Sequence, residues 1–110
     1  MPAKVDIRAV FRDRLKTARE AAQLSQKQLG IKAGLDAFVA STRINRYETG
    51  VHEPDLATIE RMASALDLPA AYFLASDERL ARLISAFHHL GAAEKEKLLK
   101  VAEKAIGIFP

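Results

Sequence analysis

The chain has 110 residues, of which 49% are hydrophobic and 28% charged, values typical of one globular domain that folds without added cross-links. It contains no cysteine, which excludes disulfides, a thiol nucleophile and a cysteine-ligated zinc ion. The formal net charge is +3, and no apolar run approaches the roughly 20 residues that a membrane span requires. The N-terminus lacks the apolar core of a signal peptide, so we expect a cytoplasmic protein.

The excess positive charge lies in the first part of the chain. Up to Arg61 there are eleven Lys or Arg and eight Asp or Glu, whereas the remainder carries six of each. A basic excess steers a protein towards polyanions. A solvated surface would explain a charge of +3 equally well, so this observation alone does not decide a partner.

The first predicted helix runs from about Asp6, its expected N-cap, to Ala22. Its apolar stripe recurs every three or four residues: Ile7, Phe11, Leu15, Ala18 and Ala22. A second, shorter helix is predicted over about Gln26 to Ala33. Ser25 and Gln28 have the spacing of a capping box before it, and Gly34 supplies the left-handed stop after it.

The segment from Leu35 to Tyr47 allows two divisions. Asp36 could cap a helix at once, or Ser41 could cap one later, and Gly50 ends it in either case. Phe38 and Val39 are expected to pack beneath the turn; the alternative is that they touch a thymine methyl group or a partner.

The rest of the chain predicts four more helical segments. Their start signals are Asp55, Pro69, Ser76 or Asp77, and the break at Gly91, which precedes a last helix over about Ala93 to Ile106. No stretch alternates with a period of two residues. We therefore predict an all-α fold of about seven helices, with an N-terminal domain over residues 1–75 and a C-terminal helical hairpin over 76–110 packed on it.

The second and third helices have the pattern of a helix-turn-helix. In such a unit one helix crosses the DNA backbone and the next lies in the major groove. Ile44 and Tyr47 would face the core, while the opposite side of the third helix carries side chains that can bond to base edges. These side chains are Ser41, Thr42, Asn45 and Arg46.

These features resemble the phage-repressor-like (Cro/cI-type, XRE) helix-turn-helix regulators over about Ile7 to Leu74. The resemblance rests on several spacings that agree at once: Arg14-Leu15…Arg19, Leu24-Ser25-Gln26-Lys27-Gln28-Leu29, Ala33-Gly34, Ile44-Asn45-Arg46-Tyr47-Glu48-Thr49-Gly50, Pro54, and Ile59…Met62-Ala63…Leu66. It implies a lambda-repressor-like five-helix domain, followed here by two further helices.

The resemblance also implies residue roles. Gln26 looks like a phosphate contact, Arg46 like a backbone or base contact, and Arg19 and Glu48 like a structural ion pair between the first and third helices. The full predicted DNA-binding set is Gln26, Lys27, Ser41, Thr42, Arg43, Asn45 and Arg46. The chain departs from the family between Gly34 and Ile44, where about four extra residues lengthen either the third helix or the turn.

We expect neither catalysis, nor a cofactor, nor a metal site. No nucleophile and base share a plausible arrangement, and there is no glycine-rich phosphate loop. His88 and His89 are adjacent and would diverge by about 100° on a helix. His52 is the only other imidazole.

The C-terminal helices carry more apolar residues than a five-helix core needs. They would either extend the core within the chain or form a dimer interface, for which we select Leu83, Phe87, Leu98, Leu99 and Ile106. The sequence thus predicts a dimeric regulator, most simply a repressor of a palindromic operator. Alternatives are an antitoxin-type or restriction-controller autoregulator with a small protein partner, and an interaction adaptor that does not bind DNA.

Overall fold

The computed structural model describes residues 4–108 and is helical throughout that range. Six α-helices and one 3-10 helix follow one another, and no strand occurs among these residues, which confirms the predicted all-α fold. The elements are α1 (Ile7–Ala21), α2 (Gln26–Lys32), α3 (Ala40–Thr49), α4 (Leu56–Ala65), the 3-10 helix η1 (Ala70–Leu74), α5 (Glu78–His89) and α6 (Ala92–Ala105).

The predicted start and stop signals act locally as expected. The Asp6 side chain caps α1 by accepting the backbone N–H of Arg8. At α2, Ser25 Oγ accepts the N–H of Gln28 at 3.0 Å, and the Gln28 side chain accepts the N–H of Ser25 at 2.8 Å. Asp55 caps α4, and Asp77, rather than Ser76, caps α5.

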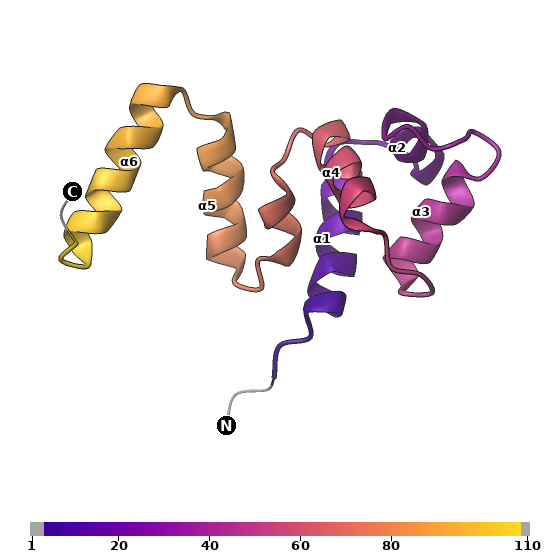
Figure 1. Cartoon of the computed structure of the whole chain (residues 1–110), viewed down its shortest axis with the longest axis horizontal. Helices are drawn as coiled ribbons and strands as arrows, with labels where there is room; N and C mark the ends of the chain where they lie inside the picture. Colours follow the sequence, from indigo (N-terminus) through magenta and orange to yellow (C-terminus); the bar gives the residue numbers. More distant parts are fainter. Residues whose placement is uncertain (1–3, 109–110) are drawn as a thin grey trace.

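Each of the first five helices contributes one large, fully buried side chain to a single core. These side chains are Leu15, Leu29, Ile44, Met62 and Phe73. In contrast, Ile7 is exposed, although it continues the apolar stripe of α1. The core therefore confirms the predicted five-helix domain, in which α1 packs on α3 and α4 packs on α2 (Figure 1).

The first turn of helix α5 is attached to this domain through Arg14. Arg14 on α1 donates to the carbonyl of Ala75 at 2.9 Å and to the Glu78 carboxylate at 2.6 Å. Its guanidinium also lies over the Tyr72 ring, 5.8 Å from the centroid. Ala81 is the residue of α5 that is buried.

Helix α6 lies at the opposite end of the molecule from α2 and α3 (Figure 1). It follows α5 after the turn at Gly91, and none of its described residues is buried. The prediction that both C-terminal helices pack on the domain is therefore wrong for α6. The alternative that their apolar residues extend the intrachain core is also wrong, because Leu83, Phe87, Leu99 and Ile106 are exposed.

Within residues 4–108, no helix combines the length and apolar composition needed to cross a membrane.

Candidate nucleic-acid interface

Helices α2 and α3 approach each other so closely that their contact requires a glycine. A Cβ atom placed on Gly30 would lie 2.6 Å from the Cβ of Ala40, well inside van der Waals contact. Leu29 and Ile44 are fully buried on the inner faces of the two helices. The position of α3 relative to α2 is thus set by direct packing.

The extra residues between these helices widen the turn. Gly34 ends α2 with φ +87°, and the backbone N–H of Phe38 donates to the Asp36 side chain at 2.8 Å. Helix α3 then begins at Ala40, after Val39, without a side-chain cap. Both predicted caps, Asp36 and Ser41, are therefore wrong: Asp36 stabilises the turn, and Ser41 lies inside the helix.

Phe38 lies in this turn, two residues before the start of α3. Its side chain is 98% exposed, so the prediction that it packs beneath the turn is wrong. Val39 is also exposed. The alternative that Phe38 touches a thymine methyl group or a partner is compatible with this exposure.

The outer face of α3 is polar and accessible. Ser41, Thr42, Asn45 and Arg46 are exposed and span about 140° of the helical wheel, whereas Ile44 and Tyr47 are buried on the other side. Among residues 4–108, the Asn45 and Arg46 side chains have no hydrogen-bond partner. The structure thus places the four predicted outer residues together with their donors and acceptors directed to solvent.

A buried ion pair connects α1 to the end of α3, as the resemblance implied. Arg19 donates to both Glu48 oxygens, at 2.6 and 3.0 Å, and to the Leu24 carbonyl at 2.9 Å. The Glu48 side chain is only 3% exposed. The hydrogen bond to Glu48 is the main reason that the pKa of Arg19 is raised. This pair orients α3 from its C-terminal end.

Two residues of the predicted DNA-binding set already have partners. The Gln26 amide donates to Glu48 at 3.1 Å, which ties the start of α2 to the ion pair. Arg43 donates to the Tyr47 hydroxyl at 2.6 Å and lies over its ring, 5.7 Å from the centroid. Lys27 is exposed at the start of α2.

Arg61 is a further positive residue near this face, and it was not in the predicted DNA-binding set. Thr58 lowers the pKa of Asp55 by hydrogen bonding, and the nearby charges of Arg61 and Arg43 lower it further. The Arg61 side chain also lies 3.9 Å from where a Gly34 Cβ would be, at the end of α2. Arg61 belongs to the basic part of the chain, but its place beside the turn depends on the packing of α4.

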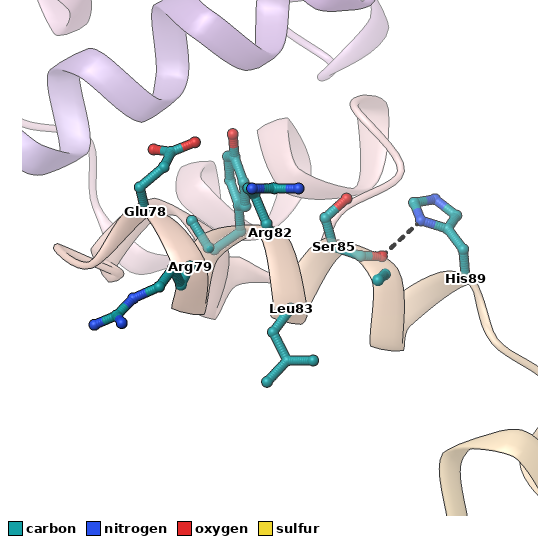
Figure 2. A pocket seen from close by; sticks show the side chains of 9 residues that line it. Glu78, Arg79, Arg82, Leu83, Ser85 and His89 are labelled. Carbon is teal, nitrogen blue, oxygen red and sulfur yellow. Dashed lines mark hydrogen bonds between the residues drawn. The ribbon is translucent and has the colours of Figure 1, made fainter. Parts of the chain in front are cut away.

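Two other features lie outside this interface. Figure 2 shows an open hollow along α5, with the Glu78, Arg82, Ser85 and His89 side chains on one side of the helix. Its acidic group, Glu78, is bound to Arg14. Beyond it, Asp67 and both C-terminal histidines of α5 gather with their ligating atoms within 4.8 Å of one another.

Comparisons with known proteins agree with this geometry. The model of a helix-turn-helix domain matches residues 10–72. The chain belongs to the helix-turn-helix domain family. This membership confirms the resemblance to Cro/cI-type (XRE) helix-turn-helix regulators.

Two solved structures are similar to this helix-turn-helix protein over most of its length. The transcriptional regulator BswR is 41% identical with a TM-score of 0.78, over 84% of this chain and 92% of BswR. The hypothetical transcription factor NHTF from Neisseria is 29% identical with a TM-score of 0.61, over 76% of this chain and 95% of NHTF. No curated protein sequence matches the chain.

Proposed function

We propose that this DNA-binding helix-turn-helix regulator represses transcription by binding a specific operator as a dimer. The observation that carries the proposal is the outer face of α3. It presents exposed, unpaired hydrogen-bonding groups on a helix whose position is fixed by Gly30 at one end and by the Arg19–Glu48 pair at the other. Groups held in this way can bond to base edges without reorganising the protein.

The residue roles follow from these positions. Asn45 can bond to an adenine edge and Arg46 to a guanine or a phosphate, while Ser41 and Thr42 suit several bases. Lys27 at the start of α2 is suited to the phosphate backbone. Gln26 and Arg43 would contact DNA with the donors that remain free. Their hydrogen bonds to Glu48 and Tyr47 would hold these donors in place.

Phe38 adds an apolar contact at the edge of the same face. It lies two residues before α3, whose N-terminal end would enter the major groove. Among the groups in that groove, the thymine methyl is the apolar one. We assign Phe38 to this contact because its side chain is 98% exposed and has no structural role in the turn.

The dimer would form through α5 and α6. An apolar cleft of about 500 Å³ lies between them, lined by residues that include Leu83, Phe87, Leu98 and Leu99. Such a surface is unfavourable in water unless a partner covers it. A two-fold dimer would also place two α3 helices on the half-sites of a palindrome.

The oligomeric state can be tested by light scattering at micromolar concentration. The wild-type protein should have the mass of a dimer, and Phe87→Glu should have the mass of a monomer. Leu56→Glu is the matched control, because Leu56 is an exposed apolar residue outside the cleft and a glutamate suits the first turn of a helix. A monomeric wild-type protein, with and without DNA, would contradict the dimer.

One alternative is favoured by the same cleft. An antitoxin-type or restriction-controller autoregulator would use α5 and α6 to hold a segment of a partner protein while it binds its own operator. In that case the isolated chain would be monomeric, and the cleft would be covered only when the partner is present.

The repressor proposal is tested by selecting bound sequences from random duplex DNA and placing the selected site in a reporter promoter. The expected result is an enriched inverted repeat, with reporter transcription lowered when the protein is present. Failure to enrich any sequence, together with affinity that does not fall as salt is raised, would overturn the DNA function. Raised transcription would overturn the repressor role alone.

A further inference from the structure

Three potential metal ligands meet where α5 ends beside the segment that follows α4. His88 Nε2 lies 3.2 Å from one carboxylate oxygen of Asp67, and His89 Nε2 lies 3.0 Å from the other. The three ligating atoms are all within 4.8 Å of one another. None of these residues belongs to the α2–α3 face, so the inference below is independent of the repressor proposal.

The position of Asp67 overcomes the usual objection to adjacent histidines. Side chains of neighbouring helical residues diverge by about 100°, which separates their nitrogens. Here His89 is the last residue of α5, and the two rings are edge to face with centroids 5.0 Å apart. Asp67, in the left-handed conformation with φ +54°, directs its carboxylate between them.

The hydrogen bonds of His89 indicate what should lie between the ring and the carboxylate. Figure 2 shows the hydrogen bond between His89 and Ser85. His89 Nδ1 lies 2.8 Å from the carbonyl oxygen of Ser85, and a carbonyl can only accept. Nδ1 therefore carries the hydrogen. In the neutral ring, Nε2 then directs a lone pair at a carboxylate oxygen 3.0 Å away. Either the proton of the imidazolium form, whose pKa the Ser85 carbonyl and Asp67 raise, or a metal ion bound to the neutral ring can lie between these two atoms.

We propose that Asp67, His88 and His89 bind one divalent transition-metal ion such as Zn²⁺. Donor atoms around a tetrahedral zinc ion are about 3.3 Å apart, given bond lengths of about 2.0 Å. The two nitrogen–oxygen separations, 3.2 and 3.0 Å, are close to that value. Metal-ligating histidines usually donate their second ring N–H to a carbonyl, as His89 does to Ser85.

The donor set also selects the class of ion. Two imidazoles and one carboxylate suit Zn²⁺, Ni²⁺ or Cu²⁺, whereas Mg²⁺ and Ca²⁺ prefer oxygen ligands. A hollow of about 380 Å³ beside the cluster is lined by Asp67, His88, Glu60 and Ser64. It leaves room for a water molecule in the fourth position.

The ion would strengthen the attachment of the last turn of α5 to Asp67. Arg14 already holds the first turn of that helix through Glu78, and Asp67 lies beside its last turn. Gly91 and α6 follow directly after His89 and Leu90. Metal binding would thus fix the direction in which α6 leaves the DNA-binding domain.

Calorimetric titration of the untagged, chelator-treated chain with Zn²⁺ tests the proposal. The wild-type protein should bind one ion per chain and melt at a higher temperature with zinc than without it. Asp67→Asn removes the carboxylate and keeps a residue that tolerates the left-handed backbone, and His89→Gln removes one imidazole. Each substitution should weaken zinc binding by about tenfold or more.

His52→Gln is the matched control, because His52 is the one histidine outside the cluster. It should leave zinc affinity unchanged. In the unmodified protein, zinc should shift the ring NMR signals of His88 and His89 but not those of His52, and an excess of Mg²⁺ should not compete. Absence of stoichiometric binding, equal affinity in wild type and Asp67→Asn, or ring shifts at His52 alone would overturn the site.

Discussion

The α2–α3 pair and the α5–α6 pair are both two helices joined by a connection, but they distribute apolar and polar residues in opposite ways. In α2–α3, the apolar side chains Leu29, Ile44 and Tyr47 are buried and the exposed face of α3 is polar. In α5–α6, the apolar side chains Leu83, Phe87 and Leu99 are exposed. The apolar surface of the first pair is covered by the rest of the domain, whereas that of the second pair is uncovered.

This difference indicates what each pair can bind. A polar helix face fixed by packing behind it is suited to a polar, charged ligand such as DNA. An apolar cleft gains free energy only when another apolar surface covers it. The two ends of the molecule, about 51 Å apart along its longest axis, are therefore suited to different classes of partner.

The largest expected effect on stability concerns the Arg19–Glu48 ion pair, which orients α3. Arg19→Ala would leave Glu48, with a 3% exposed side chain, without its counter-charge. We expect a loss of about 3–5 kcal/mol in the free energy of unfolding, measured with urea. Arg8 is also on α1, and Arg8→Ala, which breaks an exposed ion pair with Glu53, should cost about 1 kcal/mol or less. Equal losses in the two variants would show that the Arg19–Glu48 pair does not organise the fold.

The next effect concerns the close approach of α2 and α3. Gly30→Ala would place a Cβ atom 2.6 Å from that of Ala40, so we expect a destabilisation of about 1–3 kcal/mol. Adding Ala40→Gly to this variant should restore part of the lost stability, since it removes the opposing Cβ atom. Strictly additive effects in this double-mutant cycle would mean that the two helices do not meet at these residues.

The smallest effect on stability is expected at Phe38. Phe38→Ala should change the free energy of unfolding by less than about 0.5 kcal/mol, because the side chain is almost fully exposed. It should weaken operator binding by about 1 kcal/mol, the value of a lost apolar contact. Replacing operator thymines by uracil, which lacks the methyl group, should weaken wild-type binding and leave that of the variant unchanged. Equal loss in both proteins would contradict the assigned contact.

Features set by short-range chemistry were predictable from the sequence. Ser25 and Gln28 form the capping box, Gly34 takes the left-handed conformation, and Ile44 and Tyr47 are the buried side of α3, because each depends on residues within a few positions. The Arg19–Glu48 pair joins distant residues, and it was accessible only through the family resemblance.

Features that depend on tertiary packing were not predictable from local pattern. The four extra residues could lengthen a helix or a turn, and the close contact of Gly30 with Ala40 is consistent with α3 starting at Ala40. The apolar residues of α5 and α6 recur with a helical period, and this period is the same whether another part of the chain covers them or not. Asp67 meets His88 and His89 only because α5 returns alongside the end of α4.

The central claim is that the outer face of α3 reads DNA. The direct measurement is equilibrium binding of the selected operator and of a scrambled duplex by wild type, Asn45→Ala and Arg46→Ala. We expect each substitution to cost about 1–3 kcal/mol on the operator and little on the scrambled duplex, with unfolding unchanged. Operator affinity that is the same in all three proteins would contradict the account.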